Sequence, residues 1–377
     1  MSRDVLRTLA EARPAELDPA APVDPSTRAA ELGRAMRATP QRARRVRIAR
    51  PVWGGAGLVG AAAAAALVVT TMAGGGGAGG GVPGQAQEAP LDARTVLLAA
   101  AEKAEAAPAT GKFWRVKEMH LIPVEVGPKA RPYTVLDARI QETWLAGNGA
   151  SWAGFRTAGA KPATPADEKA WRLDGAPARW NLGVGDTVDK ATVYVQTKPG
   201  RGRLVKESGP ASLHVPIAGA KPTFADLRSL PADPVRLRAL ADERALSDGA
   251  DRPLAADGAQ AREAFAAGKL VTLLTEAPVP PKVRAAAFRA LAKMPIVKAE
   301  GKATDKRGRP GVAFSIDVPG AGGSVTSTRL IIDPATSQVL SEHVASKAGK
   351  AGKGKERTTL YLGAGWTNQA PQAPSLP

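Results

Sequence analysis

The 377-residue chain contains no cysteine and only three histidines, His120, His214 and His343. The lack of cysteine excludes disulfides, thiol catalysis, cysteine-bound zinc or iron–sulfur sites and a lipid-modified cysteine. The three histidines are far apart and fit no H-E-x-x-H pattern, so they predict neither a metal site nor a catalytic triad. We therefore expect no metal and no cofactor.

Motifs of the common enzyme classes are also missing. The sequence has no G-x-S-x-G, no P-loop and no G-x-G-x-x-G at a strand–helix junction. His120 shares a predicted strand face with Trp114 and Glu118, where a structural role is the better interpretation. We expect no enzymatic activity and no catalytic residues. The alternative, a secreted enzyme, predicts a polar cleft that holds carboxyl groups of perturbed pKa.

A net charge of +17 and a pI near 10.3 first suggest nucleic-acid binding. The charge is diffuse, however, and the sequence has no RRM-like, zinc-finger or helix-turn-helix pattern and no interleaving of basic and aromatic residues. We interpret the charge as a solvated surface and expect no nucleic-acid partner.

No charged residue occurs between Arg50 and Glu88. Within this interval Val52–Ala73 is apolar over 22 residues, and a helix of that length spans about 33 Å, enough for the hydrocarbon core of a bilayer. Trp53 stands where an interfacial aromatic residue is expected. The pattern predicts a single-pass membrane protein; a cleaved export signal and a long buried helix are the alternatives.

Arginines just before this segment set its expected orientation. They have no acidic neighbour, and the positive-inside rule places them in the cytoplasm and the C-terminal domain outside the cell membrane. The residues that determine this topology are Arg42, Arg44, Arg45, Arg47 and Arg50, together with Trp53.

Composition divides the chain into segments, because the Gly-rich stretch after the apolar run cannot build a core and predicts a flexible tether. The N-terminal tail is either solvated or a docking element that folds on a cytoplasmic partner. The expected segments are a largely disordered Arg-rich cytoplasmic tail (1–50), a transmembrane helix (51–73), a tether (74–90), an extracytoplasmic α+β domain (91–366) and a disordered C-terminus (367–377).

Within the outer domain, strand-like patterns precede and follow a helical block. This order predicts an α+β fold in which helices cover a twisted antiparallel sheet. Residues 160–189 look loop-rich. The expected elements are a helix over 91–107, strands over 113–124, 133–145, 150–157, 192–196 and 203–207, helices from 233, over 259–276 and up to 294, and strands over 312–318, 328–333, 338–345 and 357–362.

Three tryptophans on the first predicted strands are the candidate ligand-groove residues. Trp114, Trp144 and Trp152 are large amphipathic side chains, which either pack in a core or stack on a ligand. Core packing is the simpler interpretation, and the ligand groove is the alternative.

Four segments, in this order after an Arg-flanked apolar run, resemble an actinobacterial family of single-pass membrane proteins of uncharacterised function, often encoded beside extracytoplasmic-function sigma factors. The outer domain is more distantly similar to the half-barrels of lipoprotein-sorting carriers and periplasmic sigma-regulator sensors. The segments are LRSLPADPVRLRALA (Leu227–Ala241), LLTEAPVPPKVRAAAFRALAKMPIV (Leu273–Val297), DKRGRPGVAFSID (Asp305–Asp317) and TRLIIDPATSQVLSE (Thr328–Glu342).

This resemblance implies a signal-anchored extracytoplasmic sensor that binds a protein partner or an apolar ligand between sheet and helices, and that is linked to sigma-factor regulation. One alternative is an anti-sigma factor that acts through residues 1–50, although that tail is short and has no zinc motif. A second alternative is an exported protein that binds a lipid or another apolar ligand.

Overall fold

The computed structural model describes residues 92–184, 192–208, 215–219, 222–249, 258–319, 324–347 and 355–377. The predicted membrane segment Val52–Ala73, the arginines before it and the Gly-rich tether lie outside these residues. Among the helices of the described part, none is both long and apolar enough to cross a membrane.

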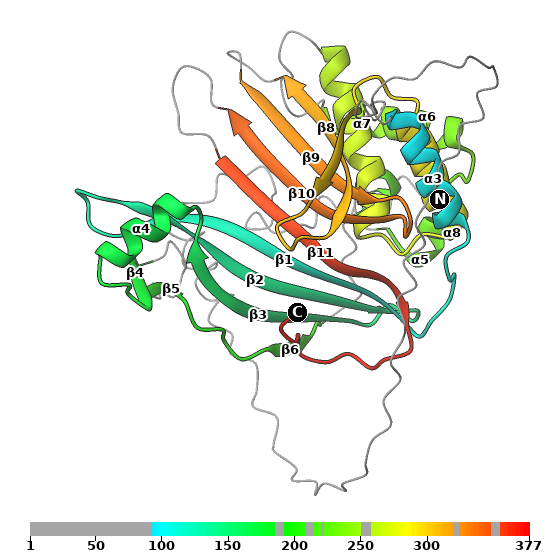
Figure 1. The fold of residues 1–377 in the computed structure, drawn as a ribbon. Coiled ribbons are helices and arrows are strands. Elements are labelled where there is room, and N and C mark those ends of the chain that lie inside the picture. The colour runs from blue at the N-terminus through cyan, green and yellow to red at the C-terminus, as the bar shows by residue number, and fades with distance from the viewer. Residues whose placement is uncertain are drawn as a thin grey trace, which may run out of the picture. The chain divides into compact units, whose positions relative to one another are not determined.

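The fold is α+β, as the order of the sequence patterns predicts, and its centre is a nine-stranded antiparallel sheet (Figure 1). The strand order is β6-β3-β2-β1-β11-β10-β9-β8-β7, and β4 and β5 form a separate hairpin. The strands are β1 (Phe113–Val126), β2 (Tyr133–Ala146), β3 (Ser151–Pro162), β4 (Arg179–Val184), β5 (Thr192–Gln196), β6 (Arg203–Lys206), β7 (Lys298–Thr304), β8 (Pro310–Pro319), β9 (Val325–Asp333), β10 (Gln338–Lys347) and β11 (Lys355–Thr367).

Pairing between β1 and β11 joins the two groups of strands into one sheet. Phe113 lies opposite Thr367 and Leu121 lies opposite Thr358, so segments more than two hundred residues apart are neighbours. The helical block between them in sequence is therefore available to cover the joined sheet.

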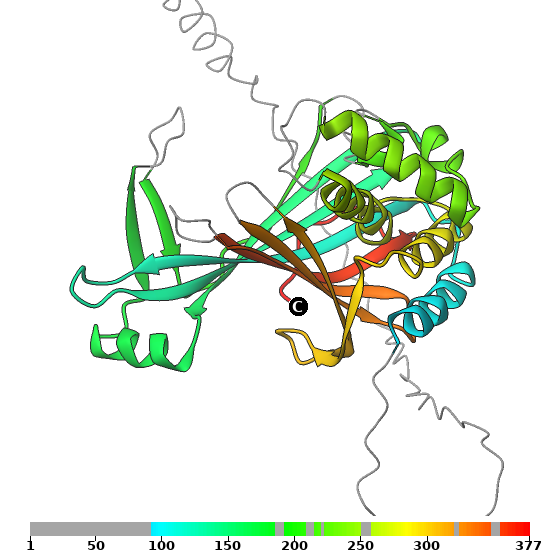
Figure 2. The same ribbon diagram turned by 90° about the horizontal axis from the view of Figure 1, so that it is seen from above.

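Helices lie on one face of this sheet, where α6 and α7 are visible on a single side in Figure 2. Apolar residues of five helices share one buried cluster with inward-facing residues of the sheet, among them Phe288 of α8 and Phe314 of β8. The helices are α3 (Ala93–Glu105), α4 (Pro165–Leu173), α5 (Phe224–Arg228), α6 (Pro234–Gly249), α7 (Gly258–Thr275) and α8 (Pro281–Leu291), with a 3₁₀ turn at Pro216–Ala218.

Strand register assigns side chains to the two faces, because alternate residues point in opposite directions. Trp114 lies opposite Leu145, and both belong to the helix-covered cluster. Lys117 lies opposite Glu142 on the other side, which we call the open face. Small apolar clusters also occupy the open face, including Met119, Ile140 and Leu360.

The prediction that residues 160–189 are loop-rich is wrong for residues 160–184, the part of this range that the structure describes. β3 continues to Pro162, α4 follows, and β4 begins at Arg179. Thr164 caps α4 by accepting a hydrogen bond from the Asp167 amide, and Pro165 occupies its first turn, both ordinary helix-start signals. The elements of this region pack on a small aromatic core in which Trp180 donates to the Tyr133 hydroxyl at 3.0 Å.

Two further elements were not expected from the sequence. β7 reads KAEGKAT and lacks the β-branched and aromatic residues typical of strands, yet it pairs with β8 at the sheet edge. The five-residue helix α5 is closed by a capping box between Thr223 and Asp226. Residues 368–377, expected to be disordered, are described without helix or strand and contact the open face of the sheet.

Arg309 bridges a place where β10 and β11 stop pairing. The paired register ends at Ser341 and Leu360, and β10 is irregular between Val339 and Ser341. The guanidinium of Arg309 donates to the carbonyl oxygens of Tyr361 at 2.8 Å and Leu340 at 2.7 Å, while Asp305 accepts from its Nε at 2.7 Å. These bonds satisfy carbonyl groups that the separated strands leave without a ladder partner.

Candidate functional site

A cleft of about 360 Å³ lies between α7 and the helix-covered face of the sheet. One part of its wall is apolar and includes Val271 of α7 with Ile316 and Val318 of β8. Another part is polar and carries Glu276, Glu342 and Arg357. The remaining lining residues are Ala264, Gly268, Thr272, Thr275 and Thr328. Its volume falls within the roughly 300–1,000 Å³ of small-molecule sites.

The acidic side chains at and near the polar wall come from three different elements. Glu342 extends from β10 and accepts a hydrogen bond from the Tyr361 hydroxyl at 3.0 Å. Glu118 of β1 does not line the cleft but acts electrostatically on Glu276, and it lies 3.3 Å from His120 Nε2. Glu276 directly follows α7. No element by itself contains this group, which forms only when α7 lies over the joined strands β1, β11 and β10.

Glu276 has an unusual environment for a carboxyl group. Desolvation by the surrounding protein atoms is the largest cause that raises its pKa to about 7, and the negative charges of Glu118 and Glu342 follow. His120 and Arg357 oppose this shift. The side chain remains exposed to water in the cleft, and this water moderates the cost of its charge. Glu276 therefore exchanges protons closer to neutral pH than an ordinary glutamate.

Tyr361 stays protonated beside these carboxylates. Burial, followed by the charges of Glu342, Glu118 and Glu276, raises its pKa well above the usual value. Its hydroxyl is therefore a hydrogen-bond donor and not a base.

The end of α7 is fixed by two contacts that hold Glu276 at the cleft. Trp114 Nε1 donates to the backbone carbonyl of Glu276 at 2.9 Å. Arg284 donates to the carbonyl oxygens of Leu274 at 2.8 Å and Ala277 at 3.1 Å, which caps the helix with a positive charge. Burial lowers the pKa of Arg284 to about 10, so it stays charged at neutral pH.

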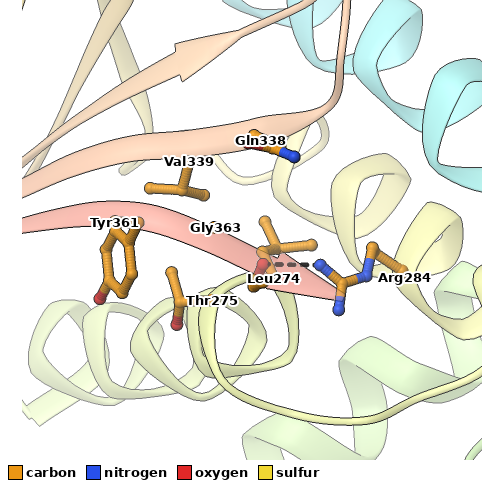
Figure 3. A pocket seen from close by; sticks show the side chains of 8 residues that line it. Leu274, Thr275, Arg284, Gln338, Val339, Tyr361 and Gly363 are labelled. Carbon is orange, nitrogen blue, oxygen red and sulfur yellow. Dashed lines mark hydrogen bonds between the residues drawn. The ribbon is translucent and has the colours of Figure 1, made fainter. Parts of the chain in front are cut away.

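Arg284 also borders a small cavity beside the cleft, shown in Figure 3. This cavity of about 10 Å³ has room for a single water molecule and lies where β10 and β11 separate. Thr275 and Tyr361 line it from the side of the cleft, and Gln338 and Val339 line it from β10.

The structure places the three predicted tryptophans on different faces. Trp114 lies on the helix-covered face, is 3% exposed and packs edge-to-face on Trp366. Trp144 and Trp152 lie opposite each other on β2 and β3, on the open face, and both contact Phe113. The three therefore do not line one common groove, and Trp114 contributes to the cleft only by holding the end of α7.

Residues that determine the predicted topology, Arg42, Arg44, Arg45, Arg47, Arg50 and Trp53, lie outside the described part of the chain. Within the described part, no group of three His, Asp or Glu side chains could hold a metal ion.

Sequence reasoning missed most of the cleft. It grouped Glu118 and His120 on one strand face with Trp114, and the register agrees. It gave no role to Glu276 or Glu342. A usable signal was present at Glu276, which ends the apolar run LVTLLTE of a predicted helix, since a charge at such a position is buried or functional more often than one on a polar face.

The arrangement suits a ligand with an apolar body and a positively charged group. Glu342 and, once deprotonated, Glu276 bring negative charge into the cleft, and Glu118 adds to it from nearby, while Arg357 and His120 oppose it. The apolar wall on α7 and β8 would remove the body of such a ligand from water.

Comparison of this chain with protein-family models, with curated proteins and with solved structures found no match.

Proposed function

We propose that this chain is a membrane-anchored protein whose extracytoplasmic α+β domain is a binding or sensor domain. The cleft between α7 and the sheet carries this proposal, because it combines a ligand-sized volume, an apolar wall and a concentrated charge. Covering a strongly twisted, half-barrel-like sheet with helices on one face gives a ligand a place between the two layers.

The ligand that fits best is an apolar molecule with an amine group. The measurement is the shift in melting temperature of the full chain in a mild detergent, with octylamine, octanoate and octanol as probes. We expect octylamine to raise the melting temperature most, because a ligand that binds only the folded state stabilises it. An equal effect of octanoate and octylamine would contradict the charge preference.

Two matched substitutions test where the amine binds. Glu342→Gln removes a carboxylate from the cleft. Glu356→Gln removes the same charge on neighbouring β11, where register places it on the open face opposite Ala345. We expect Glu342→Gln to reduce the octylamine shift and Glu356→Gln to leave it unchanged. Equal loss in both variants would indicate nonspecific charge attraction.

The membrane anchor rests on the sequence of residues 42–73. Protease added to intact protoplasts should digest a C-terminal tag and spare an N-terminal tag, with both tags on one full-length band in the membrane. A secreted product that lacks about 75 residues would identify the segment as a cleaved export signal.

A link to sigma-factor signalling extends this proposal across the membrane, with the outer domain as sensor. The alternative is an anti-sigma factor that acts directly through residues 1–50. It predicts that the full chain captures a sigma factor and that a chain lacking residues 1–40 does not; capture by both would exclude it.

Acid–base catalysis is the second candidate function, and the raised pKa of Glu276 favours it. It predicts hydrolysis of a model ester or glycoside that falls by two orders of magnitude or more in Glu276→Gln, in line with the roughly 10²–10⁴-fold contribution of general acid–base groups. Hydrolysis that is equal in the variant would come from elsewhere.

A further inference from the structure

The residues after β11 lie across the open face of the sheet. Figure 1 shows the C-terminal end beside β3 and β6, after the chain has turned back from the end of β11. Pro374 is buried there, although the residues on either side of it are exposed. A single buried proline in an exposed segment indicates that this side chain packs at a specific site on the sheet.

Two glycines make room for this proline. A Cβ atom on Gly154 of β3 would lie 2.8 Å from Pro374 Cδ, and one on Gly202 would lie 2.7 Å from the Pro374 carbonyl oxygen. Neither glycine has the positive φ that favours glycine for backbone reasons. The close approach of Pro374 is therefore the steric reason why both positions require glycine.

Two cationic side chains hold the same segment. Lys117 Nζ donates to the Ser375 carbonyl oxygen at 2.9 Å and to the Ser375 hydroxyl at 3.1 Å. Arg156 Nη1 donates to the Pro374 carbonyl oxygen at 3.2 Å. Lys117 is only 8% exposed, and this burial lowers its pKa despite the opposing charge of Glu142.

The fit leaves one donor unused. Among the described residues, Arg156 Nε is buried and has no hydrogen-bond acceptor. A buried donor without an acceptor destabilises the state that contains it. A peptide with a hydroxyl or carboxylate at this point would satisfy it.

We propose that Lys117, Gly154, Arg156 and Gly202 form a binding groove for an extended, proline-containing peptide, and that residues 372–377 of this chain occupy it in cis. This peptide groove is separate from the cleft and lies on the opposite face of the sheet. A cis segment competes at an effective concentration in the millimolar range, so a partner peptide binds only when it outcompetes or displaces the tail.

The first experiment supplies the tail in trans. A fluorescein-labelled peptide of residues 369–377 is titrated by anisotropy against the full chain and against a chain that lacks these residues. We expect the shortened chain to bind at least about tenfold more tightly, because its groove is free. A peptide with Pro374→Asp should lose binding. Absence of binding to the shortened chain, or equal binding to both chains, overturns the proposal.

A matched pair of glycine variants tests the groove itself. Gly202→Ala in the shortened chain should abolish peptide binding through the clash at Pro374. Gly147→Ala is the control, because its Cβ would meet nothing within 4 Å. Equal binding by both variants overturns the groove assignment.

The second experiment keeps the full chain and needs no deletion. Acetylation of Lys117, followed by mass spectrometry of the folded protein, reports whether the tail covers it. We expect slow acetylation in the unmodified protein and in Gly147→Ala, and at least tenfold faster acetylation in Gly202→Ala. Equal rates in all three overturn the proposal. Protection that disappears on dilution overturns the cis assignment, since it would come from the tail of a second copy.

Discussion

One face of the nine-stranded sheet is covered by α3, α5, α6, α7 and α8, which share a large apolar cluster with it. The opposite face carries two small apolar clusters, a charged group around Glu142 and the C-terminal segment. Each face has some side chains that are almost completely buried. Leu330 on the first is 2% exposed and Leu360 on the second is 1% exposed.

The difference lies in what surrounds the buried groups. The helix-covered face removes apolar surface from water over many contiguous residues, which is the dominant stabilising contribution in folding. On the open face Arg115 and Lys117 approach Glu142, whose side chain is only 2% exposed. Such pairs contribute little net stability, because desolvation offsets their attraction. We therefore expect stability to come mainly from the first face and exchangeable contacts from the second.

The largest expected effect comes from the same truncation on both faces. Leu330→Ala should destabilise the protein by about 4–5 kcal/mol, at the upper end of the Leu→Ala range, because the large cluster of helix and sheet residues around it limits collapse of the cavity. Leu360→Ala should cost about 2–3 kcal/mol, because a small cluster under a movable tail relaxes more easily. Urea denaturation of both variants provides the measurement. Equal losses would contradict the distinction between the faces.

Arg309→Leu should cost about 2–3 kcal/mol in the free energy of unfolding. The substitution leaves the carbonyl groups of Tyr361 and Leu340 without their donor and buries the Asp305 carboxylate without its guanidinium partner. Arg307→Leu is the control, because Arg307 donates to the Asp305 carboxylate through its backbone amide, which the substitution keeps. A loss as large in the control would locate the effect elsewhere in the β7–β8 turn.

The cleft should make stability depend on pH in a way that the open face does not. A glutamate whose pKa is raised from 4.5 to about 7 keeps its proton in the folded state after the unfolded chain has lost it. Stability from this group is full below about pH 4.5 and falls as the pH rises to about 7. Glu276→Gln should therefore reduce the fall in the free energy of unfolding as the pH rises, measured by urea denaturation at pH 5, 6, 7 and 8.

Glu356→Gln on the open face serves as the control for this measurement. The free energy of unfolding of this variant should fall between pH 5 and 8 as much as that of the unmodified protein. A Glu276→Gln variant with the same decline as the unmodified protein would show that solvent in the cleft keeps the carboxyl close to its ordinary pKa.

Ser375→Ala should have the smallest effect, about 0.5–1 kcal/mol, because Lys117 keeps its bond to the Ser375 carbonyl oxygen. The matching change on the other face is Thr275→Ala, which removes a buried hydroxyl bonded to the Val271 carbonyl oxygen at 3.2 Å. We expect the larger loss at Thr275. A larger loss at Ser375 would make the tail a structural element of the fold and not an exchangeable occupant.

The sequence predicted most of the strands and helices because their signals are local. Alternating Val312, Phe314 and Ile316 marked β8, and Asp233 before Pro234 marked the start of α6. Local reasoning failed at β7, where pairing at the sheet edge overrides weak strand propensity. It also failed at α4. Thr164 and Pro165 are ordinary helix-start residues, but the sequence analysis assigned them to a loop.

By itself, then, the sequence determined the α+β class and the placing of a helical block between two groups of strands, since these follow from periodicity and composition. Only the tertiary structure decided that β1 pairs with β11, that Glu276 and Glu342 line one cleft, and that Pro374 rests on Gly154 and Gly202. These contacts join residues far apart in the chain. Their formation depends on how whole layers pack, which no local pattern encodes.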